Sequence, residues 1–231
     1  MIGIVIPAHN EAGYIGATLS AVRLAAMHAD LGGEPVRTVV VLDCCSDATA
    51  TIAMQHDVCT LEVSARNVGR ARAAGAQWLL DEGARWLAFT DADTIVSPQW
   101  LVHQLALGAD AVCGSVGIDD WSPHAEHDAL IRTHFERTYT DADGHRHIHG
   151  ANLGVSAEAY RRVGGFAPLA CSEDVALVAA LEQAGARIAW SAAPRVATSA
   201  RKDARARGGF GDALLAAIAA GLAATEPPLA A

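Results

Sequence analysis

Short apolar runs alternate with segments of helical character through the first half of the chain. Each run is stopped by polar residues, and the runs cover residues 2–7, 36–42, 58–63, 86–90 and 110–116. Apolar runs of this length are typical of strands that are buried on both faces of a sheet. Helical spacing of apolar residues, or start signals such as Ser97-Pro98, mark the segments between them, namely 11–29, 46–55, 67–83 and a stretch from 97 onward. The alternation predicts an α/β fold with a mostly parallel sheet and right-handed crossovers.

The pattern changes after residue 117. A polar, histidine-rich segment covers residues 118–149 and contains an amphipathic stretch from Leu130 to Tyr139. Shorter signals predict strands at about 147–155 and 187–191, and helices at 156–163 and 173–184. We expect one domain in three parts, which are residues 1–117, residues 118–200, which cover the sheet and shape a second pocket, and residues 201–231, a basic glycine-rich loop with an alanine-rich helix or tail.

Composition narrows the class of protein. The chain has 231 residues, with 26 acidic and 17 basic side chains and a formal net charge of −9. A globally acidic surface repels a phosphate backbone, which argues against general nucleic-acid binding. Met1 runs directly into an apolar strand, the apolar stretch 213–224 is too short to span a bilayer, and the five cysteines form no Cys-x-x-Cys pair. We therefore expect a cytoplasmic protein with reduced thiols and no integral membrane segment.

The residues that directly follow the predicted strands are rich in carboxylates and amides. In open parallel sheets, ligands bind beyond the carboxyl ends of the strands. Asp91 and Asp93 follow the strand at 86–90, and two carboxylates in this spacing can chelate one hard divalent cation. The alternative is a helix-capping turn, because aspartate is common there. The sequence Thr-Asp-Ala-Asp recurs at 140–143 after a polar segment, where it predicts a solvated turn.

Two polar segments in the second half leave more than one interpretation open. If His145, His147 and His149 lie on a strand, they share one face and could bind a transition metal or line a polar substrate pocket. Glu173 and Asp174 precede an apolar helix. They form an acidic first turn that favours the helix dipole, or supply a carboxylate that deprotonates a hydroxyl, and both roles are compatible.

A basic cluster lies beside two glycines near the end of the sequence. It contains Arg201 and Arg205, together with Lys202 and Arg207. The cluster is either a solvated loop or a flap that closes on a phosphorylated ligand. In the second case, the arginines would supply bidentate contacts to phosphate oxygens.

Six motifs occur in order along the chain, and together they resemble one family. The segments are IVIPAHNEAGYIGATLSAV, VVVLDCCSDATA, NVGRARAAGA, FTDADTIVSPQWL, HGANLGVSAEAYRRVGGF and SEDVALVAALEQAG, within roughly residues 2–200. The series is similar to the family-2 glycosyltransferases of the GT-A fold. The resemblance implies a Rossmann-like sheet in a single domain, with residues 1–117 as the nucleotide-sugar-binding half and residues 118–200 as the acceptor-binding and catalytic half. It implies an inverting enzyme that transfers sugar from a nucleotide-diphosphate sugar, most often a UDP-sugar, to an acceptor that is a small molecule, glycan or lipid.

The resemblance also implies roles for individual residues. Asp174 would be the general base with Glu173 beside it, Asp93 would ligate Mn²⁺ or Mg²⁺, and Asp91 would contact the ribose or the metal. The other donor-binding residues, implied by the resemblance or by the basic flap, are Pro7, Ala8, Glu11, Asp43, Arg66, Arg70, Gly150, Ala151, Asn152, Arg201 and Arg205. A metal on the leaving diphosphate removes the need for a second carboxylate as acid, unlike in glycoside hydrolysis.

The sequence departs from the family pattern in three places. The thiols of Cys44 and Cys45 shift the serine of the second motif, which weakens the role of Asp47. No histidine follows His149, so either this histidine or its neighbours, or water and donor, complete the metal shell. The QxxRW motif typical of processive members is absent, which favours transfer of a single sugar. The alternative functions are a sugar-nucleotide-forming nucleotidyltransferase, which would be expected to have a basic loop where AHNEAGYIG stands, and a non-catalytic nucleotide-sugar-binding protein.

Overall fold

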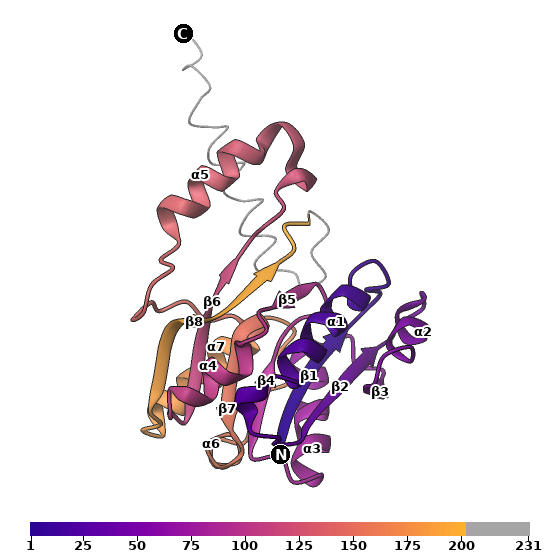
Figure 1. The fold of residues 1–231 in the computed structure, drawn as a ribbon, viewed down its shortest axis with the longest axis vertical. Coiled ribbons are helices and arrows are strands. Elements are labelled where there is room, and N and C mark those ends of the chain that lie inside the picture. Colours follow the sequence, from indigo (N-terminus) through magenta and orange to yellow (C-terminus); the bar gives the residue numbers. More distant parts are fainter. Residues whose placement is uncertain (202–231) are drawn as a thin grey trace, which may run out of the picture.

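An eight-stranded sheet forms the centre of residues 1–201, the part of the chain that the structure describes (Figure 1). In this computed structural model, neighbouring strands follow the order β3-β2-β1-β4-β7-β6-β8-β5. Their bounds are β1 Ile2–Ala8, β2 Val36–Asp43, β3 Cys59–Val63, β4 Trp86–Phe89, β5 Thr94–Val96, β6 Ala111–Gly117, β7 Leu153–Ser156 and β8 Ile188–Thr198. Only β7 and β5 run against the other strands of these residues. The predicted α/β class with a mostly parallel sheet is confirmed.

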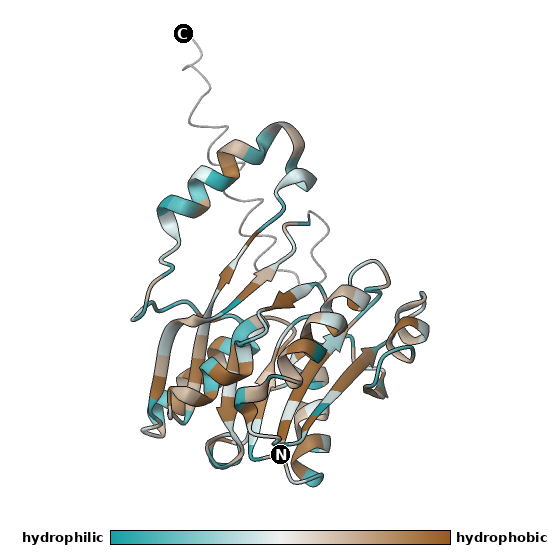
Figure 2. Cartoon of the chain, in the orientation of Figure 1, coloured by the Kyte–Doolittle hydropathy of each residue, from teal (hydrophilic) through white to brown (hydrophobic). Residues whose placement is uncertain are grey.

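Helices cover both faces of the sheet. Their bounds are α1 Ile15–Ala26, α2 Thr49–Ala53, α3 Val68–Asp81, α4 Trp100–Ala106, α5 Asp128–Thr138, α6 Ala157–Arg162 and α7 Glu173–Gln183, with 3-10 turns η1 Ala29–Leu31, η2 Ser122–His127 and η3 Gly150–Asn152. Ile4 and Ile6 of β1 belong to a buried cluster with α1 and α4, whereas Val5 belongs to a second cluster with α3 and α7. Both faces of the central strands are therefore buried, which explains their unbroken apolar sequence (Figure 2).

Helix α3 approaches the sheet closely because a glycine faces it. A Cβ atom at Gly75 would lie 2.7 Å from Cγ1 of Val5 and 2.8 Å from Cγ2 of Val41. Both valines are fully buried, so a larger side chain would push α3 away from β1 and β2. The glycine thus sets how closely the middle of α3 packs on β1 and β2.

The predicted helix at 11–29 is shorter in the structure. Helix α1 begins at Ile15, because residues 11–14 form a turn whose backbone is held by side chains. The N–H of Glu11 donates to Thr49 Oγ1 at 2.7 Å, and the N–H of Ala12 donates to Asp47 at 3.1 Å. The helix predicted at 46–55 is also shorter in the structure, where α2 covers Thr49–Ala53. The carboxylate of Asp47 accepts from the N–H of Thr49, so the helix begins at Thr49 and not at Ser46. Contacts distant in sequence therefore set the start of α1, whereas a local contact sets the start of α2.

Three strand predictions need correction. Of the predicted strand 147–155, only residues from Leu153 onward pair in the sheet, because the N–H of His147 donates to His145 Nδ1 and turns the backbone before η3. Strand β8 continues well past the predicted end at 191, since its second half pairs with β6 and β5. Strand β5 was not predicted, because three residues carry no periodic signal and depend on antiparallel pairing with β8.

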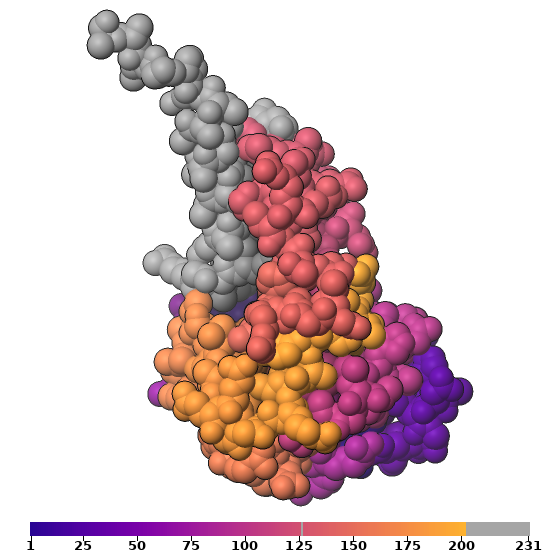
Figure 3. All heavy atoms as spheres, turned by 90° about the vertical axis from the view of Figure 1, so that its left-hand side faces the viewer, coloured from indigo at the N-terminus to yellow at the C-terminus, as the bar shows by residue number. Residues whose placement is uncertain are grey.

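Helix α5 stands away from the sheet. Figures 1 and 3 both show the segment around α5 as a projection above the body that carries the strands. Ile131 is the residue of α5 that is fully buried, in a small cluster with Ala200, Trp121 and Phe135. Within residues 1–201, no helix combines the length and the apolar character needed to cross a membrane. The predicted basic loop and alanine-rich tail lie, Arg201 apart, outside the described residues.

Candidate active site

The strand order brings the polar strand-end residues to one edge of the sheet. Strand β1 lies between β2 and β4, so the segments that follow these three strands meet there. Strand β7 runs against β4, and its first residue Leu153 pairs with Phe89 at the end of β4. Turn η3 therefore lies beside the segment that carries Asp91. This side of the sheet therefore contains the C-terminal ends of β1, β2 and β4 and the N-terminal end of the antiparallel strand β7.

Two aspartates at this edge hold loop backbone in place. The carboxylate of Asp43 accepts from the N–H groups of Ala65, Arg66 and Asn67, each at 2.8 Å. Burial alone would raise the pKa of Asp43, but these three donors together hold it below its usual value. Asp47 similarly accepts from the Ala12 N–H. Asp43 therefore fixes the loop that leads into α3, a role that the sequence motif did not reveal.

Glu11 and Asp93 share one guanidinium group. Arg201 donates to both carboxylate oxygens of Glu11, at 2.5 and 2.7 Å, and its Nη2 lies 3.2 Å from Asp93 Oδ2. Both carboxylates are largely buried. Burial, reinforced by Asp91 and Glu11 and opposed by Arg201, raises the pKa of Asp93 to about 6. Sequence-predicted residues from three distant segments thus meet at the end of β1.

A second guanidinium joins Asp91 to Glu173. Arg72 of α3 is buried, and it donates to Asp91 Oδ1 at 2.5 Å and to Glu173 Oε1. Burial opposes the charge, but Asp91 and Glu173 hold the pKa of Arg72 above its usual value. Burial also raises the pKa of Glu173, against the effect of Arg72. Arg72 was not among the predicted site residues, although its helical spacing with Ala76 and Leu79 places it on the buried face of α3.

Asp174 lies next to this bridge and is oriented by backbone. Its Oδ2 accepts from the Gly150 N–H at 2.7 Å, and its Oδ1 accepts from the Val175 N–H at 2.8 Å. A Cβ atom at Gly150 would overlap the guanidinium of Arg72, so this position requires glycine. Asp174 is partly exposed while Glu173 is buried. The two neighbouring acids therefore have different surroundings, and Asp174 is the one that solvent or substrate can reach.

The remaining predicted donor-binding residues differ in how far they are buried. Asn152 is fully buried, accepts from Trp100 Nε1 at 2.9 Å and donates to the Ser115 carbonyl at 2.8 Å, so its amide supports the core. Ala8 and Ala151 are also buried, whereas Pro7 is partly exposed and Arg66 and Arg70 are exposed at the start of α3. Arg205 lies outside the described residues.

The three histidines form part of an aromatic stack in an irregular segment. The rings of His145, His147 and His149 stack on one another, with centroids 5.7 and 6.1 Å apart, and the Tyr139 ring lies 4.1 Å from His147. His147 Nε2 accepts from the Thr140 N–H, and His145 Nδ1 accepts from the His147 N–H. Among residues 1–201, no group of three or more histidine, cysteine, aspartate or glutamate side chains is arranged to hold a metal ion. The three rings therefore form one stacked wall with Tyr139, and the alternative in which they line a polar substrate pocket stays a prediction.

His149 is expected to make stability depend on pH. Burial lowers its pKa from 6.5 to about 4, against the opposing effect of Asp174. The unfolded chain therefore binds a proton more readily, and stability falls as pH falls from 6.5 toward 4. This residue should remove about 2 kcal/mol of unfolding free energy between pH 7 and pH 5. Urea unfolding at the two pH values measures this loss, and His149→Gln should abolish that part of it; equal losses in both proteins would contradict the assignment.

The second Thr-Asp-Ala-Asp segment is a turn, as predicted. Asp143 accepts from the Ser191 hydroxyl at 2.8 Å and from the Ala192 N–H at 2.9 Å, and Asp141 pairs with Arg195. Both carboxylates are exposed. The same tetrapeptide therefore has two structural roles, which its position relative to a buried strand distinguishes.

The acidic residues at this edge, Glu11, Asp91 and Asp93, carry the oxygen ligands that divalent cations prefer. Asp91 is held by Arg72, Glu11 and Asp93 share Arg201, and burial is the main cause of the raised pKa of Asp93, with Asp91 and Glu11 adding to it. Mg²⁺ and Mn²⁺ prefer oxygen ligands, and Mg²⁺ takes one or two protein carboxylates and completes its shell with water and phosphate oxygens. Asp91 remains about one-third exposed, with a side-chain accessibility of 36%, so a ligand from solvent can reach it.

A separate shallow cavity of about 560 Å³ lies at the opposite edge of the sheet. It is lined by Arg85 just before β4, Ser156 at the end of β7 and Arg161 of α6, among others. The acidic residues follow the other end of β4, so this cavity is not part of their site. At the acidic edge, the space between carboxylates holds the guanidinium groups of Arg72 and Arg201.

The fold is of the GT-A type, as its match to solved glycosyltransferase structures shows. The chain belongs to the glycosyl transferase family 2, whose model matches residues 3–164. No curated protein matches the chain.

Solved structures confirm the fold. Residues 1–349 of TarS from S. aureus, in complex with UDP-GlcNAc, give a TM-score of 0.65 at 14% identity over 96% of this chain and 66% of that chain. Mannosyltransferase PcManGT from Pyrobaculum calidifontis, in complex with GDP-Man and Mn²⁺, gives 0.59 at 19% identity over 96% and 74%. A mycobacterial protein gives 0.61 at 18% identity with the same coverage as PcManGT. The chain thus spans about two thirds of the TarS fragment.

Proposed function

We propose that the protein is a metal-dependent, inverting glycosyltransferase that moves one sugar from a nucleotide-diphosphate sugar, preferably a UDP-sugar, to a hydroxyl acceptor. The observation that carries the proposal is the buried Arg72, which joins Asp91 at the strand exit to Glu173 beside Asp174. Membership of the glycosyl transferase family 2 supports it. So do the similar folds, whose structures contain UDP-GlcNAc in TarS and GDP-Man with Mn²⁺ in PcManGT.

Asp174 is the proposed general base. Its partly exposed carboxylate, held by the Gly150 N–H, takes the proton of the acceptor hydroxyl. The hydroxyl oxygen then bonds to the anomeric carbon from the side opposite the diphosphate, and the bond from that carbon to the diphosphate oxygen breaks. Glu173 holds Arg72 and so positions the base, since its own carboxylate is buried in that ion pair.

Asp91 and Asp93 are the proposed metal ligands. A divalent cation held there would supply positive charge for the leaving diphosphate. Pro7, Glu11 and Asp43 are the proposed contacts for the base and ribose, and they lie at or just after the ends of β1 and β2. Arg66 and Arg70, exposed at the start of α3, are available to the base or the phosphates.

Asp93→Ala should abolish metal dependence and weaken donor binding together, because it removes a ligand of the cation that the diphosphate shares. The measurement is a thermal shift with UDP or GDP and Mn²⁺. Wild-type protein should be stabilised by about 2.7 kcal/mol at a ligand concentration of one hundred times the dissociation constant. The variant should show no Mn²⁺-dependent shift.

Asp143→Ala is the matched control, since it alters the same tetrapeptide at a surface turn. It should keep the full Mn²⁺-dependent shift. Sugar transfer by the wild-type protein at an undiminished rate in excess chelator would show that the metal assignment is wrong.

A further inference from the structure

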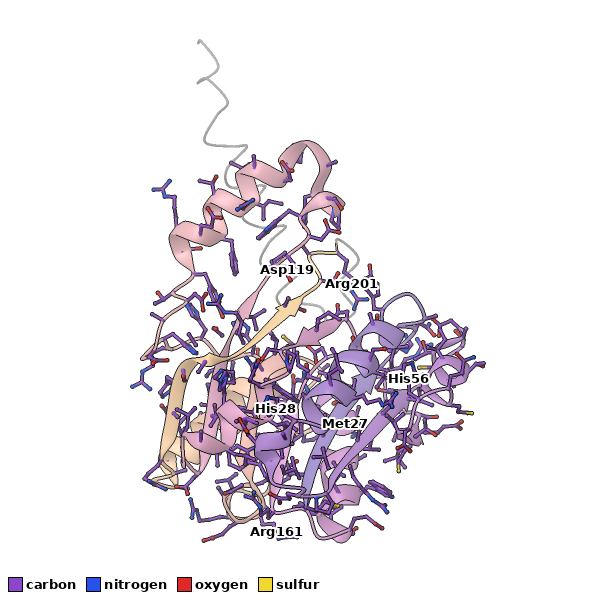
Figure 4. The ribbon with its side chains drawn as sticks, viewed as in Figure 1. Met27, His28, His56, Asp119, Arg161 and Arg201 are labelled. Atoms are coloured by element: carbon purple, nitrogen blue, oxygen red, sulfur yellow. The ribbon has the colours of Figure 1, made fainter. Side chains whose placement is uncertain are left out.

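Arg201, labelled in Figure 4, places a positive charge near the end of β1. It contacts Glu11 through both oxygens and Asp93 through Nη2. Its Cζ atom lies 5.2 Å from the centroid of the Tyr14 ring, within cation–π range. Only 11% of the side chain is exposed. A bidentate hydrogen bond, an ion pair and a ring contact therefore fix this one positive charge in place.

This charge stands against a proposed metal ligand. A guanidinium 3.2 Å from Asp93 and a divalent cation bound to the same carboxylate would repel each other at close range. Arg72 cannot take the place of Arg201, because it is buried between Asp91 and Glu173. Arg201 and a divalent metal ion are therefore alternative partners of Asp93.

We propose that Arg201 is an internal counter-ion that withholds Asp93 from metal until a nucleotide diphosphate arrives. This rests on the proposed function, since it concerns the same donor site. Without donor, Arg201 pairs with Glu11 and Asp93, and a divalent cation alone has to displace it from Asp93. With donor, the diphosphate offers the guanidinium a second anionic partner with bidentate geometry, and Asp93 becomes available.

The consequence is a coupling between metal and diphosphate that depends on Arg201. Mn²⁺ alone should bind weakly to the wild-type protein. UDP should strengthen Mn²⁺ binding more in the wild type than in a variant without the guanidinium. Removal of the guanidinium should tighten binding of Mn²⁺ alone and reduce the gain that UDP brings. Both changes have to occur together, because they are two sides of one exchange.

The test is a titration with Mn²⁺, followed by the electron paramagnetic resonance signal of the free ion, with and without UDP. Arg201→Gln should bind Mn²⁺ alone at least about tenfold more tightly than wild type, as expected for loss of a contact worth one decade. The ratio of affinities with and without UDP should fall correspondingly. Dissociation constants for Mn²⁺ alone that agree within twofold would overturn the proposal.

Two further variants keep the result interpretable. Arg195→Gln removes an equal charge from an exposed pair with Asp141 and should leave Mn²⁺ affinity unchanged. Tyr14→Leu removes the ring contact of Arg201 and leaves the carboxylates in place, so it should tighten Mn²⁺ binding by about two- to fivefold. It provides the test if Arg201→Gln folds poorly.

If wild type binds Mn²⁺ with UDP and all variants match it, the counter-ion role fails while the glycosyltransferase proposal stands. If no protein binds Mn²⁺ even with UDP, the metal-dependent function itself fails.

Discussion

Asp174→Asn should lower the rate of sugar transfer by about 10²–10⁴-fold while leaving donor affinity nearly unchanged. The amide keeps the size of the side chain, and its oxygen can still accept from the Gly150 N–H, which Asp174 binds at 2.7 Å. It cannot take a proton from the acceptor hydroxyl. Steady-state transfer kinetics, together with UDP binding measured by calorimetry, separate the two effects.

Asp128→Asn is the matched control for this variant. Asp128 also lies in the first turn of a helix, and its carboxylate also accepts from the next residue's N–H. It should leave transfer within about twofold of wild type, because surface substitutions have small effects. A non-catalytic binding protein would transfer no sugar, as wild type or as either variant, and Asp174→Asn would bind UDP as wild type does. That result would contradict the proposed enzyme activity.

Arg72→Met should destabilise the protein by about 3–5 kcal/mol. The variant leaves Glu173, which is only 3% exposed, as a buried carboxylate without its cation, and removes a partner of Asp91. Denaturation in urea, followed by circular dichroism, measures the loss. The double variant Arg72→Met/Glu173→Gln should recover part of it, since no buried charge then remains at Glu173.

Arg37→Met provides the comparison for an exposed pair. Arg37 bonds Glu82 at 2.9 Å, but both side chains are more than 40% exposed, and the expected cost is about 0–1 kcal/mol. Equal costs for Arg72→Met and Arg37→Met would show that the bridge contributes nothing beyond an ordinary surface pair.

The sequence was most informative where burial is strongest. Strands β1 and β4 lie in the middle of the sheet with helices on both faces, so their apolar runs predict them almost to the residue. Strand β5 and the second half of β8 depend on pairing with distant partners, and local sequence carries no trace of that. Helix α1 starts late because the side chains of Thr49 and Asp47 hold the preceding turn, which is again a long-range effect.

The candidate site shows the same difference between residues that local sequence places and residues that distant partners place. Asp91 and Asp93 were predictable because they directly follow a buried strand, whose end fixes their position. Arg72 was missed because its importance comes from partners 19 and 101 residues away. Asn152 stands within a predicted motif, yet its amide serves Trp100 and the core, since a motif shows which residues recur and not which way they face.

The reversed direction of β7 separates the two sides of the site along the chain. Its first residue pairs with the end of β4, so the segment before it, which carries the aromatic stack around Tyr139, approaches this end of the sheet separately from β1, β2 and β4. Exchange of residues 118–149 for a counterpart from another member would leave β1, β2 and β4 with their acids intact. Under the proposed function, this separation would allow residues 118–149 to change acceptor preference without altering the residues proposed to bind the donor.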